Sequence, residues 1–118
     1  MRNWTDEKIR EWNLQTFERD PVRQLNKVEE ELLEVEKAKR AVYNSQSSNF
    51  NEFYQETADA YIAAAGLSTY PEYAALSRLL RNKIYSSIGI VLDNYIDAKM
   101  EENIKRTFER QGNVDHHI

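Results

Sequence analysis

Apolar side chains recur along much of the chain at spacings of three and four residues, which is the period of one face of an α-helix. The clearest case follows Asp20 and Pro21, an N-cap residue and a proline at the first helical position. Its apolar positions are Val22, Leu25, Val28, Leu32, Val35, Ala38 and Val42. No stretch alternates between apolar and polar residues for long enough to indicate a β-strand. The pattern therefore predicts a long helix that begins at Pro21.

Two neighbouring segments show the same helical period. One begins at Thr5, whose side chain suits an N-cap, and continues to Phe17. The other spans residues 50–65, and Gly66 is expected to end it. Residues 44–49 are polar and of types that hydrogen-bond their own backbone, so they are predicted to connect the second helix to the third.

The rest of the chain keeps helical spacing from Pro71 to Gln111. This segment is long enough for one helix or for two, and Gly89 marks the place of an expected kink or break. The chain has 118 residues with 3 Gly and 2 Pro, which favours long helices joined by short loops. The sequence therefore predicts an all-α fold, a bundle of four to five helices that forms a single domain over residues 1–118.

Composition and charge narrow the classes of protein to which the chain can belong. With 31% charged residues, 41% hydrophobic residues and no cysteine, it suits neither a disordered tail nor a disulfide or thiolate framework. The longest apolar run, residues 60–67, is far shorter than the roughly 20 residues of a membrane-spanning helix. The net charge of −4 argues against nucleic acid as a partner. The start of the chain lacks the apolar segment of a signal peptide, so we expect a cytoplasmic location and no membrane partner.

The predicted second helix carries a run of acidic residues next to its apolar seam. Such a run most often forms a solvated face. Here, however, Lys27, Glu31 and Glu34 follow one another at spacings of four and three residues, so they form one stripe that flanks the seam. We therefore expect this stripe to lie at the edge of the core.

The predicted third helix carries two acids, Glu56 and Asp59, although most of its other residues are apolar. Burying an ionised carboxylate is costly unless it is paired with a cation or bound to a metal. A salt bridge to a neighbouring helix is one explanation. The other is that carboxylates from the two helices converge on a metal, and a set of oxygen ligands suits Mg²⁺ or Mn²⁺. A di-iron bundle would need Glu-x-x-His pairs, and the only histidines are His116 and His117.

The order of the short motifs resembles that of one enzyme family. Residues 30–34 match an E-E-x-x-E element, and residues 56–59 match an E-x-x-D element after an intervening loop. Trp12 and residues 24–27 resemble the family's lead-in, and residues 99–106 resemble its late K-x-x-x-N-x-x-R element. The chain thus resembles the MazG-like all-α nucleoside triphosphate pyrophosphohydrolases. It departs from them in the segment before the last motif, which is longer than compact members need.

The resemblance implies hydrolysis between the α and β phosphates of a nucleoside or deoxynucleoside triphosphate, which gives the monophosphate and pyrophosphate. The implied cofactor is Mg²⁺, with Mn²⁺ as an alternative, and its ligands are Glu31, Glu34, Glu56 and Asp59. Glu30 is then expected to assist Glu31 and Glu34 in catalysis by orienting the attacking water or taking its proton.

Several basic and polar residues are candidates for binding the phosphates. Lys99, Asn103 and Arg106 share one face of the last helix at positions i, i+4 and i+7, which suits a phosphate clamp as well as a solvated stripe. Lys27 is expected to reach either a carboxylate or a phosphate. The family builds its sites beside subunit interfaces, so the resemblance also implies a homodimer or homotetramer, with residues 71–111 as the candidate interface.

Two questions stay open at the level of the sequence. Five aromatic residues are candidates for stacking on a nucleobase or for filling the core, namely Trp4, Trp12, Phe17, Tyr54 and Tyr61. The acids also fit a second class of function, a non-catalytic helical module that binds a protein partner and uses them as surface charge or in salt bridges. A divalent metal should stabilise the enzyme and leave such a module nearly unaffected.

Overall fold

The computed structural model describes residues 2–45 and 50–116, and the side chains of residues 2–44 and 50–109. Its elements are α1 (Asp6–Thr16), α2 (Pro21–Ser45), α3 (Asn51–Leu67), the 3-10 helix η1 (Pro71–Tyr73), α4 (Ala74–Ile88) and α5 (Val91–His116). The described residues form five α-helices and no strand, which confirms the predicted all-α bundle. None of these helices combines the length and the apolar character needed to cross a membrane.

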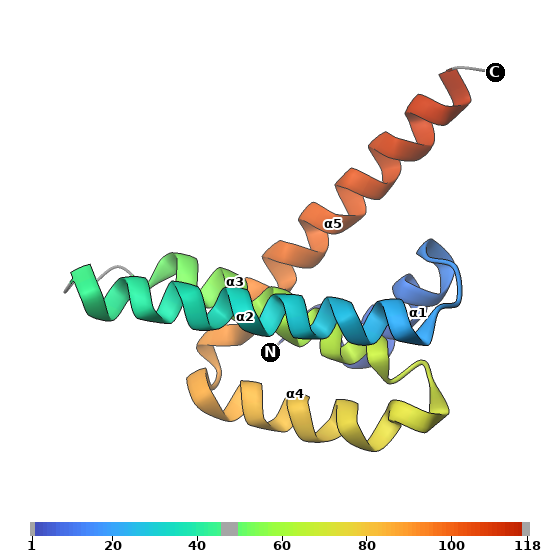
Figure 1. Cartoon of the computed structure of the whole chain (residues 1–118). Helices are drawn as coiled ribbons and strands as arrows, with labels where there is room; N and C mark the ends of the chain where they lie inside the picture. Colours follow the sequence, from blue (N-terminus) through green and yellow to red (C-terminus); the bar gives the residue numbers. More distant parts are fainter. Residues whose placement is uncertain (1, 46–49, 117–118) are drawn as a thin grey trace.

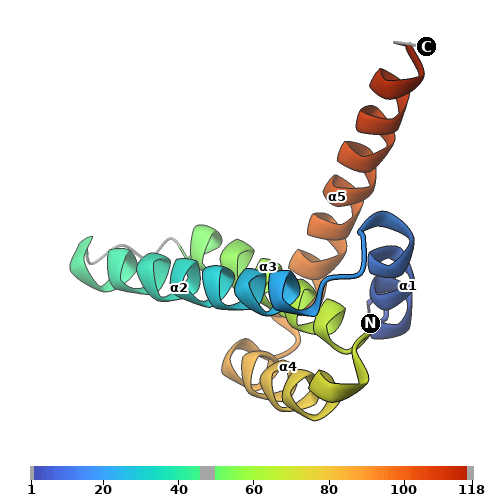
Figure 2. The ribbon, with the colours of Figure 1, turned by 45° about the vertical axis from the view of Figure 1, so that its right-hand side comes forward.

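α3 is the central helix, and α1, α2, α4 and α5 all pack against it. Figures 1 and 2 show α2 lying along α3, α4 on another side of it, and α5 leaving the bundle at a steep angle. All the residues of α3 from Thr57 to Leu67 are buried except Asp59. Five of these ten buried residues are alanines, and such small side chains allow several helices to approach one helix closely.

Two helices begin at the predicted caps. Thr5 Oγ1 accepts a hydrogen bond from the backbone N–H of Lys8 at 3.3 Å, and Asp20 Oδ1 accepts one from the backbone N–H of Arg23 at 3.0 Å. Each cap satisfies a donor that has no partner inside its own helix. The predicted starts of α1 and α2 are therefore confirmed.

Gly66 does not end α3, contrary to the sequence prediction, because the helix continues to Leu67. A Cβ atom at residue 66 would lie 2.7 Å from Nδ2 of Asn13 and 2.8 Å from Nε2 of Gln24. Glycine is required here because it lets side chains of α1 and α2 contact the backbone of α3 directly.

Two other boundaries are clearer in the structure than in the sequence. The predicted loop 44–49 begins later than expected, because α2 continues to Ser45, and residues 46–49 lie outside the described residues. The segment from Pro71 to Gln111 contains two long helices. Gly89 separates them with a φ of 81°, a left-handed conformation that favours glycine, and its N–H donates to the carbonyl of Tyr85.

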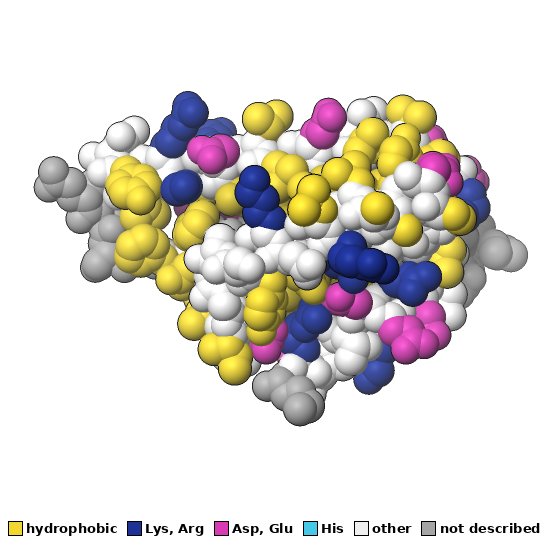
Figure 3. All heavy atoms as spheres, turned by 90° about the horizontal axis from the view of Figure 1, so that it is seen from below, with side chains coloured by type: hydrophobic (Ala, Val, Ile, Leu, Met, Phe, Trp, Pro, Cys, Tyr) yellow, Lys and Arg dark blue, Asp and Glu magenta, His cyan; other side chains and the backbone are white. Residues whose placement is uncertain are grey.

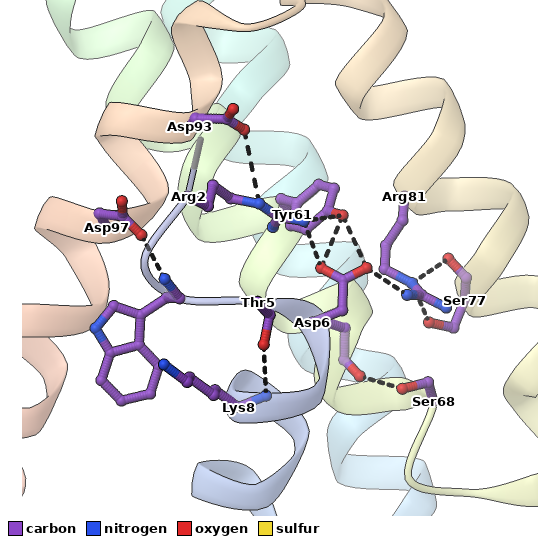
Figure 4. Close-up of polar contacts among 12 residues, drawn as sticks. Arg2, Thr5, Asp6, Lys8, Tyr61, Ser68, Ser77, Arg81, Asp93 and Asp97 are labelled. Carbon is purple, nitrogen blue, oxygen red and sulfur yellow. Dashed lines mark hydrogen bonds and ion pairs between the residues drawn. The ribbon is translucent and has the colours of Figure 1, made fainter.

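A polar network anchors the start of the chain to the other helices (Figure 4). The Asp6 carboxylate accepts hydrogen bonds from Tyr61 Oη at 2.9 Å and Arg81 Nη1 at 2.7 Å, and it forms an ion pair with Arg2 at 3.0 Å. Asp97 accepts hydrogen bonds at 2.9 and 2.8 Å from two backbone N–H groups that precede α1. These contacts attach the first residues and α1 to α3, α4 and α5.

Only the first part of α5 is buried. Leu92, Ile96 and Met100 are fully buried, whereas Ile104 is 37% exposed and Phe108 is 75% exposed. The remainder of the helix projects away from the bundle in both views (Figures 1 and 2). α5 therefore contributes to the core near its start and presents apolar side chains to solvent further along.

Candidate metal and phosphate site

Three of the predicted metal ligands converge between α2 and α3. Glu31 of α2 and Glu56 and Asp59 of α3 each offer a carboxylate oxygen, and these three oxygens lie within 4.8 Å of one another. Glu56 and Asp59 are three residues apart and therefore project from the same side of α3, which is the side that faces α2. The group could hold a metal ion. We call it the carboxylate triad.

Two lysines balance part of the charge of the triad. Lys27 Nζ lies 2.9 Å from Glu31 Oε1, and Lys99 Nζ lies 3.4 Å from Asp59 Oδ2. Glu56 forms no hydrogen bond or ion pair with any residue that the structure describes. The triad therefore combines three acids with two cations and leaves one carboxylate without a direct partner.

The surroundings of the triad disfavour negative charge. Burial raises the pKa of Glu56, and the charges of Asp59, Glu31 and Glu34 raise it further, against the opposing effect of Lys99. Burial also raises the pKa of Asp59, although the charge of Lys99 opposes this shift. An additional positive charge at this point would relieve the repulsion among the carboxylates.

The two other predicted acids lie outside the triad. Glu34 is exposed on α2, and the structure does not bring its carboxylate into the group of three. Glu30 is also exposed, and it lines a groove beside the triad. Three of the four carboxylates expected to bind a metal therefore lie together in this structure. Glu34, the fourth, lies nearer to solvent, as does Glu30.

An open groove with a volume of about 890 Å³ passes the triad. Glu31 and Asp59 lie on its wall together with residues from α1, α2, α3 and α5. Its basic lining residues are Arg23, Lys27 and Arg106. The groove therefore places acidic and basic side chains along one surface, as a site for a metal-bound phosphate requires.

The predicted phosphate clamp on α5 is divided between two environments. Asn103 and Arg106 line the groove, whereas Lys99 is ion-paired with Asp59 and is not part of the groove lining. The Arg106 side chain is 64% exposed, and its Nη2 lies 2.7 Å from Glu102 Oε1. Because an exposed ion pair is weak, this interaction leaves Arg106 available to a phosphate.

The aromatic candidates are also divided. Trp12 and Phe17 line the groove and contact each other edge to face, with ring centroids 5.3 Å apart. Tyr61 belongs to the Asp6 network, and Tyr54 packs against other aromatic rings, including that of Tyr95. Trp4 packs against the core.

Sequence reasoning missed Asn13, which lies on the groove wall and is 7% exposed. The signal was present, because Asn13 follows the buried Ile9 by four residues and therefore occupies an apolar face of α1. Gln24, which was part of the family-like lead-in, lies close by and donates from Nε2 to the carbonyl of Ala63 at 2.8 Å. The groove thus has a polar amide wall in addition to its charged wall.

The chain was also compared with protein-family models, curated protein sequences and solved structures. None of these comparisons finds a match. The triad and the groove beside it are therefore the features from which a function can be inferred.

Proposed function

We propose that this protein is a Mg²⁺-dependent nucleoside triphosphate pyrophosphohydrolase, which cleaves a nucleoside or deoxynucleoside triphosphate between its α and β phosphates. The observation that carries the proposal is the convergence of Glu31, Glu56 and Asp59 within 4.8 Å beside a groove that also contains Lys27 and Arg106. A polyphosphate in this groove meets cationic side chains together with a group of carboxylates able to hold a metal.

The residues of the triad fit a magnesium or manganese ion. Their donor atoms are all carboxylate oxygens, which these hard cations prefer, and Glu56 has no direct partner among the described residues. Glu31, Glu56 and Asp59 would hold the ion, with Glu34 close enough to add its charge. A bound divalent cation supplies neutralisation of phosphate charge and a lower pKa for a coordinated water.

The remaining groove residues have roles that follow from their positions. Lys27, Asn103 and Arg106 bind phosphate oxygens, and Lys99 holds Asp59 in place. Glu30 orients the attacking water and accepts its proton. The water oxygen then bonds to the α-phosphorus, the bond to the bridging oxygen breaks, and its electron pair leaves with pyrophosphate.

Product analysis tests this function directly. The wild type should release pyrophosphate, not orthophosphate, from at least one member of a panel of canonical and modified nucleoside triphosphates in the presence of Mg²⁺. Asp59→Asn should abolish the release, because it removes a metal ligand. Glu36→Gln is the matched control, because Glu36 is an exposed acid of α2 that pairs with Arg40. Orthophosphate as the product, or full activity in Asp59→Asn, would contradict the proposal.

The two lysine–carboxylate ion pairs favour a second candidate function. In a non-catalytic module that binds a protein partner, Lys27–Glu31 and Lys99–Asp59 would be permanent salt bridges between or along helices. Such a module needs no metal, and removing Asp59 would strand a partly buried lysine and lower stability. The metal and stability measurements described in the Discussion separate the two functions.

The proposal includes self-association into a homodimer or homotetramer through α4 and α5. Ile104 and Phe108 are exposed on the projecting part of α5, and Leu79 is 64% exposed on α4. Figure 3, which shows the molecule from the α4 side, has hydrophobic side chains at the surface between charged ones. A second copy would cover such surfaces. Light scattering that gives a 14.0 kDa monomer at micromolar concentration would contradict this part of the proposal.

A further inference from the structure

One part of the groove wall is polar without being charged, and it contains the largely buried residue Asn13. As a whole residue Asn13 is 7% exposed, and it lines the groove. Its side-chain amide makes no hydrogen bond with any residue that the structure describes, although its backbone carbonyl accepts one from the N–H of Phe17. Buried amides in proteins are normally hydrogen-bonded, because leaving them unpaired is costly. An unpaired amide on a groove wall therefore points to a ligand.

The neighbouring residues hold this amide in place. The Asn13 and Gln24 amide nitrogens lie 2.7 and 2.8 Å from the position that a Cβ of Gly66 would take, so both amides are packed against the backbone of α3. Gln24 also donates to the carbonyl of Ala63, which fixes its orientation. The indole N–H of the adjacent Trp12 is buried and has no acceptor among the described residues. The wall thus presents prepositioned hydrogen-bonding groups next to an aromatic ring.

The amide wall lies at a defined distance from the triad. Gln24 precedes Glu31 by seven residues on α2, and Ala63 follows Glu56 by seven residues on α3. Seven residues are about two helical turns, or roughly 10 Å along a helix. The contact between Gln24 and Ala63 thus lies about two turns from Glu31 on one helix and from Glu56 on the other, which suits a ligand with phosphates at one end and a planar polar group at the other.

We propose that Asn13, supported by Gln24 and Trp12, recognises the hydrogen-bonding edge of the nucleobase. The inference rests on the proposed function, since it assumes phosphates at the triad. An amide offers a donor and an acceptor side by side, as the edge of a nucleobase does. The edge of the base then hydrogen-bonds the Asn13 amide, which has no partner among the described residues. Asn13 is then a residue that determines specificity, whereas the triad determines the reaction.

The test compares a nucleoside triphosphate with inorganic triphosphate as ligands. Calorimetric titration with Mn²⁺ present measures the affinity of the wild type for inorganic triphosphate and for the α,β-methylene analogue of each nucleoside triphosphate in the panel, which cannot be cleaved between its α and β phosphates. Asn13→Leu removes the amide at nearly constant shape, and Asn13→Ala removes it without any risk of a clash. Gln15→Leu is the control, because Gln15 is exposed on the same helix and is not part of the groove lining.

In both Asn13 variants the affinity for the best nucleoside triphosphate should fall roughly ten- to a hundredfold, the effect of losing one or two hydrogen bonds to a buried group. Their affinity for inorganic triphosphate should not change, and this retained binding also shows that they are folded. Unchanged affinity for nucleoside triphosphates, or an equal loss for both ligands, would overturn the base subsite while the phosphate site stands. A wild type that binds neither ligand would overturn the proposed function and the base subsite with it.

Discussion

Acidic side chains lie partly buried against α3 in two places, and their negative charge is balanced differently in each. The first group is the single carboxylate of Asp6. Its two oxygens are contacted by Tyr61 Oη, Arg81 Nη1 and Arg2 Nη2 at 2.7 to 3.1 Å. Burial acts to raise the pKa of Asp6, but the hydrogen bonds and charges of these partners hold it below its ordinary value. The first group therefore favours the ionised carboxylate.

The second group is the triad of Glu31, Glu56 and Asp59. Its lysine partners contact Glu31 and Asp59, and burial with mutual repulsion raises the pKa of Glu56 and Asp59. Fully partnered groups of the first kind stabilise a fold, whereas incompletely balanced groups beside a groove are typical of functional sites. A carboxylate against one side of α3 therefore stabilises the fold, whereas the carboxylates on another side are incompletely balanced and could hold a cation.

The largest expected difference between the two groups is the change in the free energy of unfolding when one of their carboxylates is neutralised. Asp6→Asn should lower the free energy of unfolding by about 2 kcal/mol, because it leaves the partly buried Arg81 without its carboxylate and removes one of the two carboxylates that pair with Arg2. The melting temperature should fall by roughly 8 °C. Asp59→Asn should leave the metal-free protein equally stable or more stable, because it removes repulsion. Urea unfolding followed by circular dichroism measures both, and an Asp59→Asn variant as unstable as Asp6→Asn would favour the salt-bridge module.

A divalent metal should also distinguish the two groups, through a smaller change in the free energy of unfolding. At a concentration about ten times its dissociation constant, Mg²⁺ or Mn²⁺ should stabilise the wild type by about 1.4 kcal/mol. The rise in melting temperature should shrink in Asp59→Asn and persist in Asp6→Asn, which retains the triad. Thermal melts with and without metal provide the measurement. A wild type whose melting temperature does not change with either ion would contradict the proposed metal site.

The smallest expected effect is the change in stability with pH. The ionised carboxylate of Asp59 destabilises the fold, whereas that of Asp6 stabilises it, so the two respond differently to acid. The raised pKa of Asp59 means that its destabilising effect is fully present above that pKa and disappears as the pH falls through it toward the ordinary value of 3.8. The lowered pKa of Asp6 means that its stabilising effect persists down to about 3.8 and is lost below it.

Metal-free unfolding experiments between neutral pH and pH 3 should therefore show two different trends. The difference between wild type and Asp59→Asn should close on mild acidification, while the difference between wild type and Asp6→Asn remains until the pH falls below about 3.8. If both differences closed over the same pH range, the contrast between the two groups would be wrong.

Short-range patterns in the sequence are sufficient to predict the helices and the faces on which the acids lie. Thr5 and the pair Asp20–Pro21 mark helix starts through bonds to residues three positions away, so their effect is local. The three-residue spacing of Glu56 and Asp59 likewise places both on one side of a helix before any tertiary contact forms. Such features depend on a few neighbouring residues, and a pattern along the chain is sufficient to predict them.

Contacts between side chains of different helices, in contrast, follow from the tertiary structure. The packing of α2 on α3 brings Glu31 to the acids of α3 and leaves Glu34 outside the triad. The packing of α5 brings Lys99 to Asp59, and that of α1 buries Asn13 against Gly66. These outcomes depend on how closely and at what angle two helices pack, which side chains far apart in the sequence determine together. For the same reason Gly66, a helix-ending signal in the sequence, became a point of contact between three helices.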